Sequence, residues 1–177
     1  MAGFHFRSYC EETDFDIVYK VACDHGEAVT KYEVSGCSYY PEREMFRKGL
    51  RNQFERLIYP CIVADEKDDR AIGLAYPYER YRLGRCWKLM ICMWEHPEFT
   101  KEVLIGMLDR LFETGNTNMV RLQFAGNEEV LLAACREIGM KEVGCIPDCR
   151  SYMGKLVDEY HFIMKRDAWT EQKQNQE

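Results

Sequence analysis

The hydrophobic pattern of the chain is most regular in its middle, where two strand-like segments each precede a helical one. Residues 86–94 form an apolar run of strand length, and residues 100–113 follow with apolar side chains at helical spacing. Residues 119–124 alternate as a half-buried strand does, and residues 127–138 are again helical. Apolar strands followed by amphipathic helices predict a sheet covered by helices, in a mixed α/β domain.

The N-terminal part of the chain predicts one strand and two or three helices. Residues 4–9 alternate between apolar and polar side chains, as a strand does. Thr13 or Asp14 is placed to cap the helix that follows. A further helical piece is expected up to Gly36, and Pro41 is suited to the first position of another helix.

Two further pairs of strands are predicted on either side of the central segment. Residues 61–64 and 71–78 form a hairpin around a polar turn. Residues 141–146 and 160–165 form two closing strands, and residues 147–159 between them are expected to be a long hairpin connection or loop.

The chain is predicted to be one domain over residues 1–169, followed by a polar tail over residues 170–177. Its 177 residues are enough for one domain with a substantial core, and no repeat or linker divides them. The tail lacks an apolar anchor, so we expect it to be disordered.

Charge and cysteine content exclude several classes of function. A net charge of −6 and a pI of about 5.4 argue against nucleic acid as the main ligand. No apolar run is long enough to span a bilayer and no signal peptide is present, so we expect a cytoplasmic protein without a membrane partner. The nine cysteines are irregularly spaced, which predicts reduced thiols used as small apolar residues, without disulfides or a metal site.

Several short stretches match one protein family in order, over nearly the whole chain. They read FRSY and ETD near the start, IVA and AIG in the first hairpin, KEVL and LFE in the helix of residues 100–113, and GMKEVG, MGK, DEY and MKRDAW towards the end. Together they resemble the GNAT (GCN5-related N-acetyltransferase) superfamily, in the branch that acetylates ribosomal-protein N-termini. The resemblance implies an α/β (α+β) fold with a mixed, mostly antiparallel central sheet and helices on both faces.

The resemblance also implies a cofactor site. In this family the fourth and fifth strands splay apart, and acetyl-coenzyme A (acetyl-CoA) enters the gap. Its pyrophosphate binds N–H groups at the start of the following helix, as anions do at helix N-termini. The cofactor-binding residues implied here are Met90, Ile91, Glu98, Phe99, Thr100, Lys101 and Asn127.

The phosphate loop departs from the family pattern of Gln or Arg, two residues, Gly, one residue, then Gly or Ala. Glu95 begins the loop here, while Glu98 and Thr100 replace the two glycines. The two carboxylates would repel a pyrophosphate, and Lys101 is the cation that we expect to offset them. The alternative is structural: Pro97 begins a helix, and Glu98 complements its dipole in place of a ligand.

The catalytic positions implied by the resemblance are altered as well. Cys135 stands where the family often carries the tyrosine that protonates the departing thiolate, and a thiol can donate that proton. The alternative is that Cys135 is packed in an apolar helix face. Asn127 lies one residue from the family's asparagine position. For a general base the sequence offers Glu79, after the third central strand, or Glu95.

Four aromatic residues are predicted to line the side of the cleft that receives the acetyl acceptor: Tyr76, Tyr78, Trp87 and Tyr152. They stand at the ends of segments that should border the cleft. Half-buried strand residues with hydrated hydroxyls are the other interpretation.

Two functions therefore remain open. The first is an acyl-CoA-dependent N-acyltransferase that moves an acetyl group from acetyl-CoA to a small-molecule or peptide amine. The second is a GNAT-fold binding or regulatory module without coenzyme A. The fold favours the enzyme, and the loop favours the module. A homodimer is compatible with either.

Overall fold

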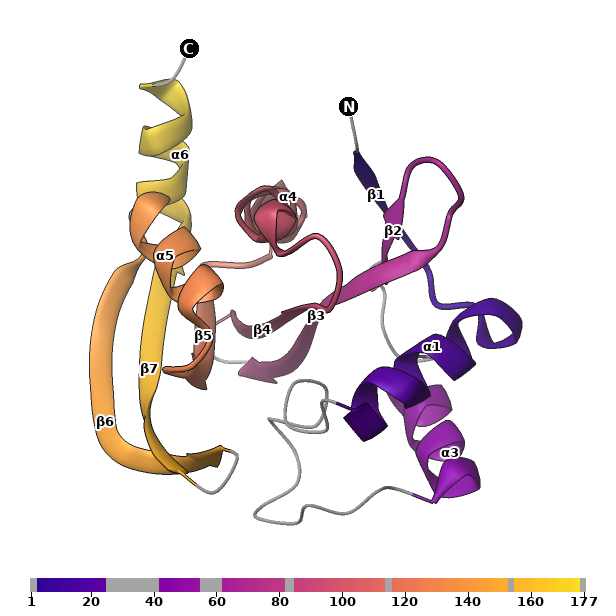
Figure 1. Cartoon of the computed structure of the whole chain (residues 1–177). Helices are drawn as coiled ribbons and strands as arrows, with labels where there is room; N and C mark the ends of the chain where they lie inside the picture. Colours follow the sequence, from indigo (N-terminus) through magenta and orange to yellow (C-terminus); the bar gives the residue numbers. More distant parts are fainter. Residues whose placement is uncertain are drawn as a thin grey trace. The chain divides into compact units, whose positions relative to one another are not determined.

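The computed structural model of the chain describes residues 3–24, 42–54, 62–81, 85–113, 116–152 and 155–175. The side chains of residues 24, 52–54, 79–81 and 151–152 are not part of the description. Seven strands form one sheet in the order β1-β2-β3-β4-β5-β7-β6 (Figure 1). The ladders β1–β2, β2–β3, β5–β7 and β6–β7 are antiparallel, and β4–β5 is parallel. This confirms the predicted fold class.

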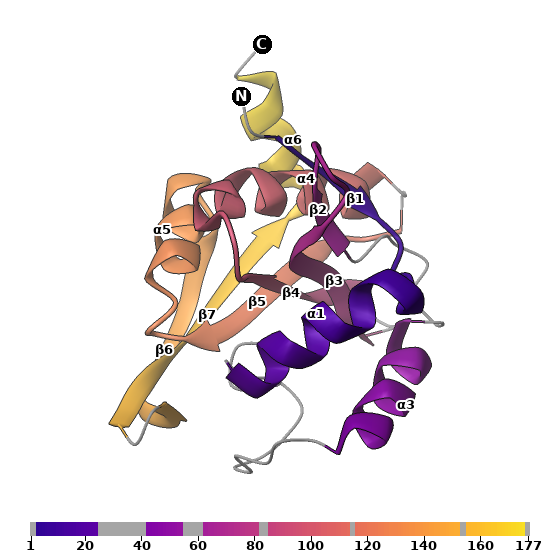
Figure 2. The same ribbon diagram turned by 45° about the vertical axis from the view of Figure 1, so that its right-hand side comes forward.

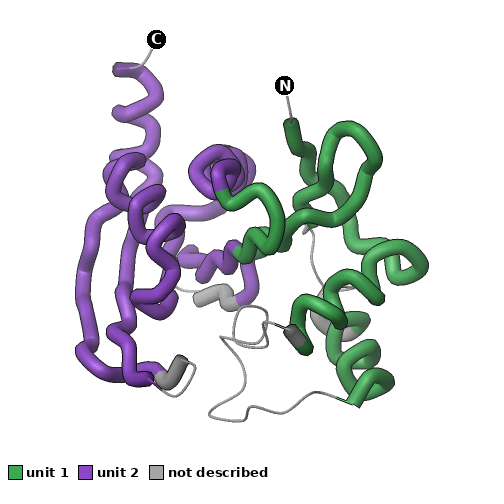
Figure 3. The backbone as a smooth tube through the Cα atoms, viewed as in Figure 1, with its two compact units in different colours: residues 1–76, 92–97 green, residues 77–91, 98–177 purple. Residues whose placement is uncertain are grey.

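The chain divides into two compact units (Figure 3). Residues 1–76 and 92–97 form the first, and residues 77–91 and 98–177 form the second. The prediction of a single domain over residues 1–169 stays a prediction. Each unit is described by itself.

The first unit contains β1 (Phe4–Arg7), α1 (Glu11–Asp24), α3 (Arg43–Phe54), β2 (Ile62–Asp65) and the first part of β3 (Ala71–Tyr81). Phe15 and Val18 of α1 are buried, as the helical spacing predicts, and the Phe15 ring packs on Phe46 of α3. The helix starts earlier than predicted, because the Asp14 carboxylate accepts from the Cys10 N–H at 2.8 Å. Gly36 and Pro41, named in the helix predictions, lie outside the described residues.

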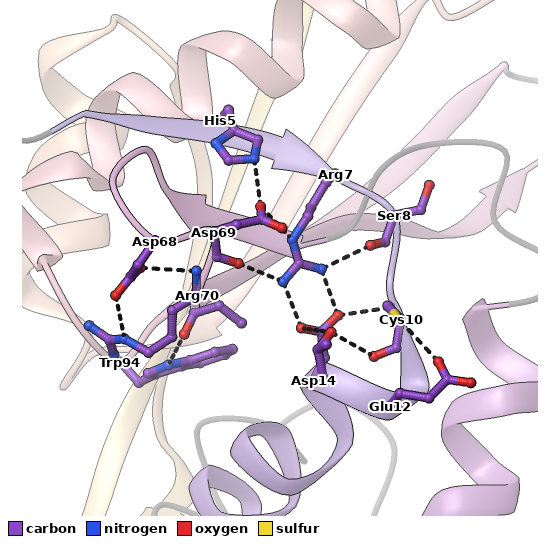
Figure 4. A network of polar contacts seen from close by, with 12 residues as sticks. His5, Arg7, Ser8, Cys10, Glu12, Asp14, Asp68, Asp69, Arg70 and Trp94 are labelled. Atoms are coloured by element: carbon purple, nitrogen blue, oxygen red, sulfur yellow. Dashed lines mark hydrogen bonds and ion pairs between the residues drawn. The ribbon is translucent and has the colours of Figure 1, made fainter.

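A polar network ties β1 to α1 and to the turn between β2 and β3 (Figure 4). Arg7 donates from Nη1 and Nη2 to the two oxygens of Asp14, each at 2.7 Å, and from Nε to Asp69 at 3.0 Å. His5 contacts the same Asp69 oxygen at 2.9 Å. Asp69 adopts a φ of 58°, which suits the predicted polar turn.

The second unit contains most of β4 (Cys86–Met93), α4 (Thr100–Glu113), β5 (Met119–Ala125), α5 (Glu129–Glu137), β6 (Lys141–Tyr152), β7 (Lys155–Lys165) and α6 (Arg166–Gln174). Helix α4 spans the predicted residues because its buried side chains, such as Leu104 and Leu108, recur at helical spacing. The core of this unit includes the sheet, where the ring of Phe124 on β5 stacks on the ring of Phe162 on β7 with 5.7 Å between the centroids. Gly139 follows α5 with a φ of +70°, a conformation that glycine adopts without strain and that commonly ends a helix.

The predicted connection over residues 147–159 is too long, because most of these residues belong to strands. β6 and β7 form a long antiparallel hairpin beside β5 (Figure 2). Between the pairs Ile146↔Glu159 and Arg150↔Val157, β6 advances four residues where β7 advances two. This bulge accommodates Pro147, which cannot donate to a ladder.

The predicted disorder of the tail from Thr170 is also wrong for most of its length, because α6 extends to Gln174. Trp169 is buried and donates from Nε1 to the Asp109 carboxylate on α4 at 2.9 Å. Lys173 binds the other Asp109 oxygen at 2.8 Å. The polar residues after Trp169 therefore continue α6, and the buried Trp169 side chain holds this helix against α4.

Seven of the nine cysteines lie in the described part of the chain, and all seven are free thiols. Among the described residues, no helix combines the length and the apolar character that crossing a bilayer requires.

Candidate active site

The candidate site begins where β4 and β5 stop pairing. The two strands run parallel, and their ladder extends only from Cys86↔Met119 to Lys88↔Arg121. Both strands continue beyond these residues without a further shared pair in the described chain. This confirms the prediction that they are neighbours that separate towards their C-terminal ends.

Met90 and Ile91 lie in the part of β4 beyond its ladder with β5, and both side chains are buried. On this side the described β5 supplies no ladder partner for their backbone groups. Buried backbone N–H and C=O groups are rarely left without a partner. This segment of β4 therefore suits a ligand that carries its own amides.

The start of α4 agrees with the structural interpretation of the loop sequence. Pro97–Phe99 form a 3₁₀ turn, and α4 begins at Thr100, which is buried. Glu98 is exposed in this first turn, where a negative charge complements the helix dipole. Anions also bind favourably at such a position, so Glu98 and a phosphate would compete for the same partial charge.

The expectation that Lys101 offsets the loop carboxylates stays a prediction, because Lys101 and Glu95 each have another ion-pair partner in the structure. Arg70 forms an ion pair with Glu95. Lys101 Nζ binds Oε2 of Glu137, on α5, at 2.9 Å. The guanidinium of Arg70, which the sequence analysis did not consider, therefore balances Glu95.

The residues that lead from β4 towards α4 are fixed to β3 within the first unit. The N–H groups of Trp94 and Glu95 both donate to the Ile72 carbonyl at 3.2 Å, and Trp94 Nε1 donates to the Ala71 carbonyl at 3.2 Å. His96 then adopts a φ of 52°, a conformation that favours glycine. A glycine-free sequence thus makes the sharp turn here at a cost in backbone strain.

Two predicted site residues belong to the β5–α5 segment. The Oδ1 atom of Asn127 is buried and has no hydrogen-bond partner among the described residues. Cys135 is fully buried, and burial raises the pKa of its thiol to about 12. The thiol is therefore protonated at neutral pH, as a proton donor must be. Its complete burial on the same face as Leu131 favours the packed alternative.

A network missed by the sequence analysis lies on β5, β6 and β7. The buried Glu159 carboxylate accepts from Gln123 Nε2 at 2.8 Å and contacts His161 Nε2 at 2.9 Å. It also accepts from Arg150, while Arg121 Nη2 donates to Oε1 of Gln123 at 2.9 Å. The alternation of Arg121 and Gln123 with buried residues along β5 was the available signal.

Scans against family models and curated proteins return no match to this sequence. Solved structures do match. Mutant forms of the spermidine/spermine N-acetyltransferase SpeG from Vibrio cholerae superpose with a TM-score of 0.73 at 14% identity, over 96% of this chain and 98% of that one. A GNAT-family acetyltransferase from Bacillus anthracis superposes with a TM-score of 0.69 at 13% identity, over 93% and 95% of the two chains. The chain has the GNAT fold. The separation of β4 and β5 is thus the feature of the GNAT fold that the family resemblance implied.

The remaining predicted positions in this GNAT fold stay predictions. Tyr76 is buried in the first unit, which favours its interpretation as a core residue. In the second unit Tyr78 and Trp87 are half-buried, and Lys88 Nζ lies 5.8 Å from the centroid of the Tyr78 ring. The side chains of Glu79 and Tyr152 lie outside the described residues. The closer resemblance to ribosomal-protein acetyltransferases also stays a prediction.

Proposed function

We propose that this protein is an acyl-CoA-dependent N-acyltransferase that moves an acetyl group from acetyl-CoA to an amine. The observation that carries the proposal is the parallel β4–β5 ladder that ends at Lys88↔Arg121. The other described ladders of the sheet are antiparallel. Because the β4–β5 ladder stops early, backbone N–H and C=O groups in the buried part of β4 are available to a ligand. The structural neighbours are acetyltransferases, which supports the same function.

Three features of the second unit suit acetyl-CoA. The free side of β4 around Met90 and Ile91 is extended, as needed to pair with amide groups of the pantetheine arm. The unpartnered Asn127 Oδ1 is an acceptor for an amide or hydroxyl of that arm. The N-terminus of α4, from Phe99 to Lys101, offers its dipole to the pyrophosphate.

Two features of the same unit favour the second candidate, a binding module without coenzyme A. Glu98 already supplies a negative charge to the first turn of α4. Lys101 is engaged with Glu137. Pyrophosphate binding must displace or outweigh these contacts. The enzyme and the module therefore differ in one measurable property, which is the affinity for acetyl-CoA.

The acetyl acceptor is proposed to be a primary amine on a small molecule or a peptide. The neighbouring SpeG structures are of a spermidine/spermine N-acetyltransferase, and a further neighbour, a spermidine N-acetyltransferase from Vibrio cholerae with a TM-score of 0.71 at 15% identity, is dodecameric. A polyamine is thus one acceptor to test, and self-association is one property to measure. The net charge of −6 suits a cationic acceptor.

The test is a melting curve with and without acetyl-CoA. A ligand that binds only the folded state stabilises it by about 2.7 kcal/mol at a hundredfold excess over its dissociation constant. We expect a rise in melting temperature for the wild type. Glu98→Gly should enlarge the rise, because it removes a like charge and gives phosphate closer access to the backbone.

Two further variants separate charge from backbone access. Glu98→Gln removes only the charge, so the difference between it and Glu98→Gly reports backbone access. Glu129→Gln is the matched control, because Glu129 is an exposed acid at the first turn of α5 and should leave the shift unchanged. A shift confined to Glu98→Gly would favour the module, and no shift in any variant would exclude acetyl-CoA as the ligand.

A further inference from the structure

One face of β5 and β7 carries polar side chains that the proposed cofactor site does not use. Along β5 the buried Leu122 and Phe124 alternate with Arg121 and Gln123. The antiparallel register places Gln123 opposite His161 of β7. Residues that oppose each other in a ladder share one face of the sheet. Glu159, two positions before His161, shares that face by the alternation of strand side chains.

Glu159 is a buried carboxylate held in its charged form. It is 4% exposed, and burial alone would raise its pKa. The hydrogen bond and positive charge of Arg150 outweigh burial, and the contacts with His161 and Gln123 add to them, so the pKa is lowered. A charged carboxylate accepts hydrogen bonds and donates none.

This charge fixes the tautomer of His161. Its Nε2 lies 2.9 Å from Oε1 of Glu159, so the proton of a neutral imidazole resides on Nε2. The lone pair is then on Nδ1, which is the arrangement of a general base oriented by an acid. The His161 side chain is 17% exposed, so the ring is held by Glu159 and is not completely buried.

The ladder beside His161 has open space. Gly144 of β6 is opposite His161, and a Cβ built on Gly144 would meet no described atom within 4 Å. A side chain at this position would narrow the approach to the imidazole. The absence of one leaves room for a small group.

The position of His161 relative to the β4–β5 opening follows from the register. Arg121 is the last residue of β5 that pairs with β4, and Gln123 lies two residues beyond it. His161 opposes Gln123 on the next strand, and neighbouring strands are about 4.8 Å apart. His161 therefore stands one strand away from the part of β5 that borders the opening.

We propose that His161 is the general base of the acetyl transfer and that Glu159 is its positioning residue. This rests on the proposed function. The acceptor arrives as an ammonium group, and His161 takes one proton from it at Nδ1. The neutral amine attacks the thioester carbonyl, its C–N bond forms and the C–S bond breaks. The second proton leaves the nitrogen and ends on the departing thiolate, and His161 returns its proton to water.

The test uses the full-length protein, acetyl-CoA and ethylamine at high concentration, followed by loss of thioester absorbance across a range of pH. The charged groups that take part in the hydrogen-bond network of His161 are Glu159, Arg150 and, through Gln123, Arg121, and all are retained in His161→Gln. Ethylamine titrates identically in every reaction, so its ionisation cancels in the ratio of variant to wild-type rates. Melting curves with acetyl-CoA accompany every variant.

We expect His161→Gln to lower kcat/KM for the amine about 100- to 10,000-fold and the ratio of variant to wild-type rates to change with pH. Glu159→Gln should change the pH dependence of the corresponding ratio, which a purely structural role would not do. Gly144→Phe should raise the KM of the amine with an unchanged acetyl-CoA melting shift. His5→Gln is the matched control, because His5 contacts the Asp69 carboxylate at the same 2.9 Å on β1 and should retain wild-type rates.

Each contrary result is decisive. Equal rates and equal pH profiles for wild type and His161→Gln would overturn the role of His161, while a retained melting shift would leave the proposed function standing. A wild type that binds acetyl-CoA without accelerating its aminolysis by ethylamine would also overturn the role of His161. No melting shift for the wild type would reject the proposed function and the general base together.

Discussion

The ion pair between Arg7 and Asp14 gives a stability prediction with a control on the same helix. Asp14 is 1% exposed and binds the Arg7 guanidinium through both oxygens at 2.7 Å. Asp16, two residues further along α1, forms an ion pair with Arg43 but is 77% exposed. The two aspartates thus differ in burial while sharing residue type, helix and kind of partner.

Asp14→Asn is expected to lower the free energy of unfolding by about 3–5 kcal/mol, because the half-buried Arg7 guanidinium loses its buried counter-charge and keeps only the exposed Asp69. Asp16→Asn should cost at most about 1 kcal/mol, because water screens an exposed pair. For a chain of this size, each kcal/mol corresponds to about 2–4 °C in melting temperature. The expected losses are therefore about 6–20 °C for Asp14→Asn and less than about 4 °C for Asp16→Asn.

The assay is urea unfolding followed by tryptophan fluorescence, with melting curves in parallel. A double variant, Arg7→Leu with Asp14→Leu, removes both charges and should recover part of the loss, since apolar pairs often replace buried ion pairs without penalty. Recovery should be incomplete because Arg7 also donates to Asp69. Equal losses for Asp14→Asn and Asp16→Asn would refute the reasoning, as would a double variant less stable than Asp14→Asn.

Two other predictions concern the C-terminal helix and the start of α4. Trp169→Ala should lower the free energy of unfolding by about 3–5 kcal/mol, whereas Trp169→Phe should lower it by about 1 kcal/mol, for the lost hydrogen bond to Asp109. Equal urea midpoints for the wild type and Trp169→Ala would show that Trp169 does not anchor α6. Lys101→Ala should weaken acetyl-CoA binding, and the loss of affinity should be larger at low salt than at high salt. Glu137→Gln should tighten binding up to about fivefold, because it releases Lys101 from its ion pair. Calorimetry measures both affinities. Weaker binding to Glu137→Gln would contradict this account.

Local periodicity predicted the elements that bury one face against the core. Helix α4 spans the expected residues because its apolar side chains recur every three or four positions. The separation of β4 from β5 was also predictable, since both are apolar strands followed by helices. In these cases the residues that determine the structure lie within a short window of sequence.

Prediction failed where a distant partner overrides the local signal. Pro147 suggested the end of a strand, but the β6–β7 ladder resumes beyond it through a bulge. The residues after Thr170 lack an apolar anchor of their own, yet Trp169 holds α6 through Asp109, sixty positions earlier in the chain. The residues adjacent in sequence give no sign of either contact.

The contact between Glu159 and His161 shows the same limit at the candidate site. Glu159 fell in a predicted loop and His161 in a predicted strand, so nothing indicated that they share a face. Their relation to Gln123 depends on the β5–β7 register, and a shift of one residue would turn both side chains to the opposite face. One clue was still available in the sequence. Arg121 and Gln123 are polar residues on a strand that the fold places between two others, and such residues need partners from neighbouring strands or from a ligand. Polar alternation on an interior strand therefore deserved a site prediction before Glu79, whose only qualification was its place after a strand.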